Sequence, residues 1–268
     1  MIGRRLRHFA AIWRLGLAEA VAYRGALFVW ILNSSFPLIA LALWAGLARA
    51  GPIGDYDRPG FVAYFVAAFL VRQLTASWVV WDLERQVVTG ELSTLLLRPV
   101  HPILHHLMTN LAALPVRALI AAPVAAIVLV LALGDAGLEL ARGGALALAI
   151  PAIIGGFLLN FVVQLTIGCL AFWFTRSSAL FELWLALFIA LSGYAVPTSL
   201  FPGGLAELVR FLPFHAGLGF PVELLLGRLD AAAAARGFLI QWTWLLGLSV
   251  TAGLAWRRGA RHFSAVGA

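Results

Sequence analysis

The sequence predicts an all-α polytopic membrane protein with six transmembrane helices, and two observations support this prediction. Of the 268 residues, 62% are hydrophobic and only 12% are charged, whereas soluble domains have roughly 45–50% and about 25%. The mean hydropathy is +0.95, and several apolar stretches approach the ~20 residues that a helix needs to cross the hydrocarbon core of a bilayer. This composition excludes an ordinary soluble enzyme.

Residues 1–24 predict an amphipathic helix that lies at the inner surface of the membrane. Leu6, Phe9 and Trp13 recur at helical spacing, and most of the arginines in this segment fall on a different face. Charged residues interrupt each apolar stretch that would serve as the core of a signal peptide, so we expect the segment to stay attached.

Residues 25–268 predict one six-span domain. A proline at position 151 is expected to bend the fourth span. Residues 82–106 form the most polar long stretch of the chain, whereas residues 197–236 are hydrophobic but broken by Pro and Gly, which favours short re-entrant helices on the external side before the last span. The expected spans are 25–48, 61–81, 115–133, 145–174, 180–200 and 237–256.

The charge of the chain predicts its orientation in the membrane. The 19 basic residues outnumber the 12 acidic ones, for a net charge of +7, and all of the basic residues are arginines. If the N-terminus lies inside, eleven arginines fall in cytoplasmic segments, whereas the external loops combine six arginines with seven acidic residues. The positive-inside rule therefore predicts that both termini are cytoplasmic, and we expect no nucleic-acid partner.

Several kinds of chemistry are excluded or disfavoured. The chain has no lysine, so it lacks the phosphate-binding lysine of a P-loop; if the protein uses ATP, another chain must bind it. Cys169 is the only cysteine and lies in an apolar run, which excludes intrachain disulfides. His101 and His105 have a spacing compatible with a metal, but no nearby carboxylate completes a ligand set, and a basic interfacial cluster is the favoured interpretation. We expect no catalytic residue, metal or cofactor in this chain.

The 82–106 segment combines charged residues with a compact leucine cluster. Helical spacing places Leu92, Leu95 and Leu96 at adjoining positions. Such an element can dock into a groove on a soluble partner, or it can fasten the loop to membrane lipids. The residue pattern alone leaves both interpretations open.

The same segment carries a motif, G-x-L-x-x-x-L-L-R-P, at Gly90, Leu92, Leu96, Leu97, Arg98 and Pro99. With this motif the chain resembles the permeases of type-2 ABC exporters. Two further features are similar to that family: six spans that follow an N-terminal interfacial helix, and a Pro-rich segment that ends in LLLG at residues 224–227. The likeness covers essentially the whole chain.

The resemblance implies a transmembrane permease subunit that pairs with a second permease, identical or related, in the bacterial cytoplasmic (inner) membrane. A coupling helix in residues 82–106 would contact separate cytoplasmic ABC ATPase subunits, which hold ATP and Mg²⁺, and the complex would export a hydrophobic or amphiphilic substrate. An integral membrane lipid-modifying enzyme and a non-transporting scaffold for a sensory ATPase remain the alternatives. Residues carried over as the ATPase contact are Gly90, Glu91, Leu92, Leu96, Arg98 and Pro99, with Leu92 and Leu96 as apolar anchors and with Glu91 and Arg98 as charged partners.

Polar residues inside the spans are candidates for a substrate pathway. An arginine at the depth of Arg72 costs ~2.5–3.5 kcal/mol on insertion scales, so it either lines a pathway for anionic headgroups or polar substrate, or pairs structurally with Glu182 or a carbonyl. Asn160 and Gln164 either line a cavity or join helices, and we expect Arg117 to extend to the inner interface. The tentative pathway set is Arg72, Gln73, Phe157, Asn160, Phe161 and Gln164.

Overall fold

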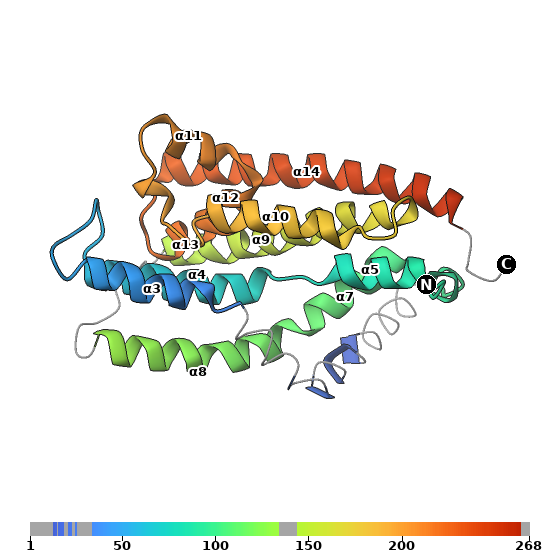
Figure 1. Ribbon diagram of the computed structural model, residues 1–268, viewed down its shortest axis with the longest axis horizontal. Helices are drawn as coiled ribbons and strands as arrows, with labels where there is room; N and C mark the ends of the chain where they lie inside the picture. Colours follow the sequence, from blue (N-terminus) through green and yellow to red (C-terminus); the bar gives the residue numbers. More distant parts are fainter. Residues whose placement is uncertain are drawn as a thin grey trace.

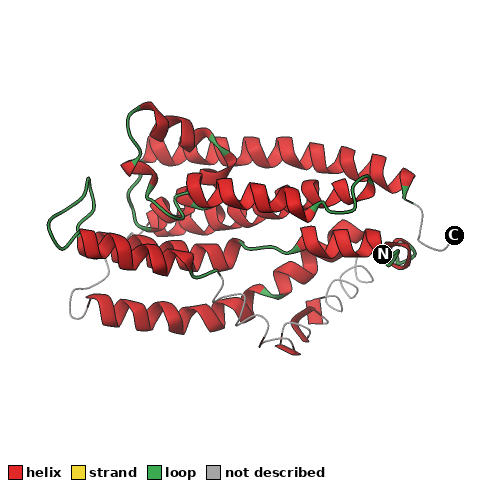
Figure 2. Ribbon diagram, in the orientation of Figure 1, coloured by secondary structure: helices red, strands yellow, loops and turns green. Residues whose placement is uncertain are grey.

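A computed structural model describes residues 34–133 and 144–263, together with residues 13–14, 16–18, 21–22 and 25. Within these residues the chain is helical; it contains no β-strand, and its one isolated bridge joins Ile53 to Tyr56 in a loop (Figure 2). The all-α prediction is confirmed.

Four helical units of the described chain are long and apolar enough to cross a bilayer. They correspond to the second, third, fourth and sixth expected spans and confirm a polytopic membrane protein. The units are Arg58–Val88, made of α4 (Arg58–Thr75) and α5 (Val79–Val88); Pro102–Ala132, within α7 (Pro102–Ala112) and α8 (Leu114–Leu133); Leu146–Phe172, within α9 (Gly144–Gly168) and the 3₁₀ helix η1 (Cys169–Phe172); and α14 (Ala231–His262).

Two further apolar helices are shorter. The helices α3 (Phe36–Leu47) and α10 (Ser178–Leu191) have 12 and 14 residues, or about 18 and 21 Å of helix, against a hydrocarbon core of about 30 Å. Residues 26–33 of the first expected span lie outside the described residues. The prediction that the fifth span continues to residue 200 was wrong, because the helix ends at Leu191 and the chain turns at Gly193, whose φ is +90°.

The long helices run side by side along one axis (Figure 1). The helix α9 packs against α14, α5 and α4, and α4 packs between α3 and α8. In the most apolar windows of the four units, 72% of residues are buried for α4–α5 and 50% for α9, but only 17% for α7–α8 and for α14. The helices α4, α5 and α9 therefore form the centre, and α8 and α14 present apolar surface of the kind that faces lipid or another chain.

Short helices connect α10 to α14. They are η2 (Thr198–Leu200), α11 (Gly204–Phe211), α12 (Pro213–Gly217) and α13 (Gly219–Leu225). The helices α12 and α13 are buried and pack against α9, whereas α11 is largely exposed. Short helices in residues 197–236 are therefore present as expected, and their depth in a bilayer stays a prediction.

The N-terminal helix expected over residues 1–24 falls mostly outside the described residues. Gly16 is described, and it lies against Thr109 and Ala112 of α7.

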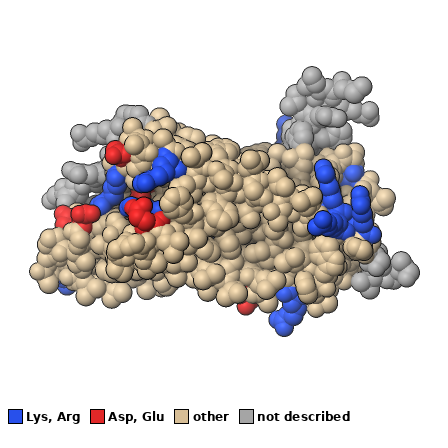
Figure 3. Space-filling model, turned by 90° about the horizontal axis from the view of Figure 1, so that it is seen from above, with Lys and Arg blue, Asp and Glu red and all other residues tan. Residues whose placement is uncertain are grey.

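The two ends of the molecule differ in charge. Acidic and basic side chains lie together at one end, whereas a basic group lies at the other end (Figure 3). The helix α14 ends at this second end (Figure 1), and its last turns contain Arg257, Arg258 and Arg261. The 82–106 segment lies at this second end, because His101 contacts Trp256 of α14 with ring centroids 5.4 Å apart.

Candidate functional site

The 82–106 segment consists of the second half of α5, the short helix α6 (Leu92–Leu96) and the start of α7. The turn between α5 and α6 depends on Gly90, whose φ of +80° is strained for residues with a side chain. Arg85 and Glu91 form an ion pair across the turn, and the Thr89 hydroxyl donates a hydrogen bond of 2.8 Å to the Arg85 carbonyl. Because both charged side chains are about half exposed, the pair contributes only about 0–1 kcal/mol.

The leucines of the segment divide between the interior and the surface. Leu92 and Leu95 are 0% and 8% exposed and belong to an apolar cluster with residues of α5, α9, η1 and α14. Leu96 and Leu97 are 43% and 88% exposed, and Arg98 is exposed beside them. Leu92, a predicted anchor for the partner, is thus buried inside this chain, and Leu97 is the most exposed of the four leucines.

Polar contacts fix α5 to two neighbouring helices. The Glu84 carboxylate accepts hydrogen bonds from the Ser177 hydroxyl (3.0 Å) and from the backbone N–H and hydroxyl of Ser178 at the start of α10. Gln86 bonds to the buried ring of His106 in α7, at 3.0 Å. A displacement of the 82–106 segment would therefore reach α7 and α10 directly.

A break in the second span separates α5 from α4. The span expected to be continuous over residues 61–81 is interrupted, which corrects the prediction: α4 ends at Thr75, Ala76 is extended with ψ 144°, and α5 begins at Val79. Such a break frees backbone donors and acceptors, which need partners where no water is available.

Side chains from three neighbouring helices supply these partners. Each makes one long-range hydrogen bond to the backbone of residues 76–78, so the break is held from α7, α8 and α9 at once. The bonds run from Arg117 Nη1 to the Ala76 carbonyl (2.6 Å), from Gln164 Nε2 to the Ser77 carbonyl (2.8 Å), and from the Trp78 N–H to Asn110 Oδ1 (3.2 Å).

Arg117 does not extend to the inner interface, and that expectation was wrong. Its side chain is only 1% exposed, and its guanidinium lies 3.8 Å from the centroid of the Trp78 ring. The freed Ala76 carbonyl and this aromatic face give the cation a better partner than a longer path to water.

The predicted pathway arginine, Arg72, lies near the end of α4 and is partly buried. Its guanidinium is 5.1 Å from the centroid of Phe188 and lies beside the Tyr194 hydroxyl. Within the described residues it forms no ion pair with Glu182, which is exposed. Gln73 is 3% exposed, and its Nε2 has no hydrogen-bond partner among the described residues.

The four predicted pathway residues of α9 point into the protein. Phe157 and Phe161 stack with centroids 6.4 Å apart, and both are buried. Asn160 Nδ2 donates to the Gly156 carbonyl (3.0 Å) and to the Gly217 carbonyl (3.5 Å), which links α9 to α12. Together with the Gln164 bond to the break, these contacts favour helix joining over the lining of an open cavity in this conformation.

Sequence reasoning did not single out two of the polar residues that join helices. They are Asn110 in α7 and Gln241 in α14. Gln241 Nε2 donates to the carbonyls of Ala152 (2.9 Å) and Ala216 (2.8 Å), and so joins α14 to α9 and α12. Both are single amide side chains within an apolar stretch, and this pattern could have identified them as residues that join helices.

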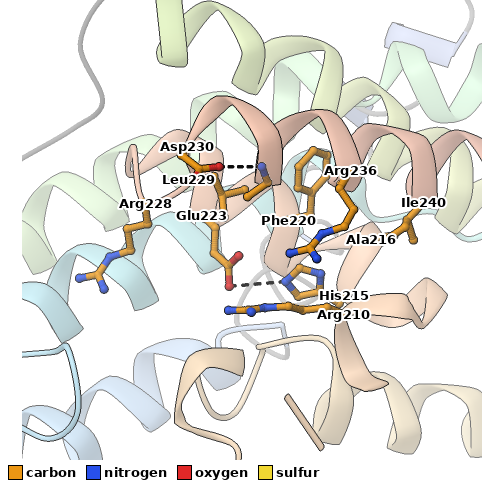
Figure 4. A pocket seen from close by; sticks show the side chains of 12 residues that line it. Arg210, His215, Ala216, Phe220, Glu223, Arg228, Leu229, Asp230, Arg236 and Ile240 are labelled. Carbon is orange, nitrogen blue, oxygen red and sulfur yellow. Dashed lines mark hydrogen bonds and ion pairs between the residues drawn. The ribbon is translucent and has the colours of Figure 1, made fainter. Parts of the chain in front are cut away.

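A pocket of about 220 Å³ opens among α11, α12, α13 and the start of α14 (Figure 4). Inside it, His215 Nε2 lies 3.5 Å from Glu223 Oε1, and the Thr198 hydroxyl donates to the same carboxylate oxygen at 2.7 Å. Burial alone would raise the pKa of Glu223, but the attraction of His215, its bonds to His215 and Thr198, and Arg210 together hold that pKa below its usual value. The carboxylate is therefore favoured in its ionised form although it is buried.

The histidines of the 82–106 segment are engaged locally. His101 caps α7, since its Nδ1 accepts from the Ile103 N–H at 3.3 Å, and His106 bonds to Gln86. In the part of the chain that the structure describes, no group of three His, Cys, Asp or Glu side chains is placed to hold a metal ion.

Comparison with known proteins agrees with this architecture. The family model described as "ABC-2 family transporter protein" matches residues 34–267, which is most of the chain and includes the 82–106 segment, the broken span and the pocket. Among curated proteins, none matches this chain. The chain therefore belongs to the ABC-2 family of transporter proteins and is a multi-pass transmembrane permease of an ABC transporter.

Proposed function

We propose that this permease is the membrane half of an ATP-driven exporter and that the 82–106 segment is the surface gripped by a cytoplasmic ABC ATPase. The carrying observation is the projecting tip of the segment, where Leu97 is 88% exposed next to Leu96 and Arg98. A short amphipathic element with exposed apolar side chains beside a cation can dock into a groove on a soluble partner. Buried Leu92 holds the tip against the bundle, while Gly90, Glu91 and Pro99 shape the turn on either side of it.

The contacts of α5 support a mechanism for coupling. ATP and Mg²⁺ bind in the partner subunits, and closure of those subunits pushes on the tip. The push passes through Glu84 to α10 and through Gln86 to α7, while the break at residues 76–78 lets α5 tilt relative to α4. Paired with a second permease chain, identical or related, the spans then open a path outward for a hydrophobic or amphiphilic substrate. Arg72 is the pathway residue that we retain.

Cysteine labelling tests the orientation on which this proposal depends. Cys169 is the only cysteine and is fully buried, so Leu97→Cys introduces one accessible thiol. In the bacterial cytoplasmic membrane with both termini inside, a membrane-impermeant maleimide should label Leu97→Cys in inverted vesicles but not in intact cells. The control, Asp55→Cys in the exposed loop at the opposite end, should show the reverse. Labelling of Leu97→Cys from outside overturns the proposal.

A charge substitution tests the ATPase contact. Leu97→Asp should lower co-purification of a co-expressed ABC ATPase about tenfold or more, with unchanged membrane insertion. Leu208→Asp, on α11 at the other end and 58% exposed, is the matched control and should leave co-purification intact. Equal recovery with both variants contradicts the assignment. Recovery without ATP-dependent transport in vesicles would instead favour the sensory scaffold, and no ATPase association at all would favour a membrane enzyme.

A further inference from the structure

A groove of about 310 Å³ lies among α3, α4 and α8, at the opposite end of the bundle from the 82–106 segment. The helices α3 and α8 both pack on α4 (Figure 1), and the space between them is open. Its walls are apolar, with Leu41 and Ala45 from α3, Val62 from α4 and Ala132 from α8. The volume is at the lower end of ligand sites, so it suits part of a larger molecule.

Two arginines stand at one end of this groove. Arg49 follows α3 and Arg58 begins α4, and both side chains line the groove and are exposed. Within the described chain neither guanidinium has an ion-pair partner. The nearest acid in sequence, Asp57, uses its carboxylate to accept from the Gly60 N–H at 2.8 Å and so caps α4.

This combination of surfaces matches an amphiphile. A hydrocarbon alone would gain nothing from two cations that no acidic side chain of the described residues pairs, and a small anion in water would gain nothing from apolar walls. Guanidinium groups bind phosphate oxygens through paired, charge-assisted hydrogen bonds. We propose that the groove binds an anionic phospholipid, with its phosphate between Arg49 and Arg58 and with an acyl chain along the α3 side of the groove. This inference is independent of the proposed transport function.

The glycine at position 46 allows the apolar part of the site to be tested separately. Gly46 lines the groove, and a Cβ added there would meet nothing within 4 Å. The space next to this Cβ is open, so we expect the longer side chain of Gly46→Leu to occupy the acyl path. The charge part is tested by the double variant Arg49→Gln/Arg58→Gln. Its matched control is Arg257→Gln/Arg258→Gln, which removes the same charge from exposed positions at the far end of α14.

The measurement is retention of dioleoylphosphatidylglycerol by the full-length protein, counted by native mass spectrometry from a neutral detergent. We expect Gly46→Leu and Arg49→Gln/Arg58→Gln each to lower the affinity for this lipid about tenfold, while Arg257→Gln/Arg258→Gln retains it. Dioleoylphosphatidylcholine should bind more weakly than phosphatidylglycerol, and inorganic phosphate should not compete with it. Thermal unfolding of each variant confirms that it is folded.

Other outcomes overturn the inference. Unchanged binding in Gly46→Leu, or competition by inorganic phosphate, would show an anion site without an acyl chain. Equal loss in both double variants would show unspecific attraction between a basic protein and an acidic lipid, and no loss in any variant would place the lipid elsewhere.

Discussion

Asn110 allows the energetics of the broken span to be tested at one side chain. Asn110→Leu keeps the approximate shape but removes the acceptor for the Trp78 N–H and the Ser77 hydroxyl, both at 3.2 Å. A buried donor left without a partner costs about 1–3 kcal/mol. The hydroxyl can rotate to another acceptor whereas the N–H cannot, so we expect a loss of about 2 kcal/mol in the free energy of unfolding.

Thr109→Val is the control for this experiment. Thr109 is adjacent, and among the described residues its hydroxyl bonds only to carbonyls of its own helix, those of His105 (3.2 Å) and His106 (3.0 Å). Its removal should cost less than about 0.5 kcal/mol. Reversible unfolding in mixed micelles by increasing SDS, followed by the fluorescence of the ten tryptophans, measures both variants. If Asn110→Leu matches the wild type, or if Thr109→Val loses as much, the break is not held by side-chain partners.

Three further predictions concern other parts of the chain. Gly193→Ala should lower the free energy of unfolding by about 2 kcal/mol, because the residue has a φ of +90° and an added Cβ would lie against the Tyr64 hydroxyl. Unfolding by SDS measures this loss, and a variant as stable as the wild type would contradict the requirement for glycine in this turn. Glu84→Ala should leave ATPase co-purification intact but lower the amount of substrate transported per ATP hydrolysed, because it removes the hydrogen bonds between α5 and α10. An unchanged ratio of transport to hydrolysis would show that Glu84 does not transmit the movement of α5. The lowered pKa of Glu223 stabilises the folded state fully above the ordinary value of 4.5, and this stabilisation is lost as the pH falls through the lower folded value. The wild type should therefore lose more stability than Glu223→Gln as the pH is lowered from above 4.5; parallel pH curves for the two proteins would show that this carboxylate does not contribute.

The parts of the fold that follow from composition were predictable. The second, third, fourth and sixth expected spans correspond to helices long enough to cross a bilayer. Backbone N–H and C=O groups without hydrogen-bond partners are costly in lipid, so an apolar run of this length is expected to form a helix. The end of α10 was missed because residues 192–200 carry no charge and directly follow an apolar run, while the turn depends on the positive φ of Gly193 and on the Tyr64 hydroxyl, which donates to its carbonyl at 2.9 Å.

The 82–106 segment could be singled out from the sequence, but the side chains that it exposes could not. The motif located the 82–106 segment, yet helical spacing cannot tell which leucine faces the bundle, and Leu92 and Leu97 have opposite exposures. Residues 76–78 contain no proline or glycine, so the sequence gives no local signal of the break. It depends on Arg117 and Gln164, which are distant in sequence, so only the three-dimensional arrangement could reveal it.

The broken second span also bears on how the protein is made. Nothing local in residues 58–88 demands an interruption, and an isolated segment of this kind would satisfy its own backbone best as one unbroken helix. The side chains that compensate for the break belong to α7, α8 and α9, which the ribosome delivers later. We therefore expect the second span to insert as one continuous helix and to break only after the following helices have been inserted. A nascent chain truncated before α7 should then have an unbroken second span, unlike the finished protein.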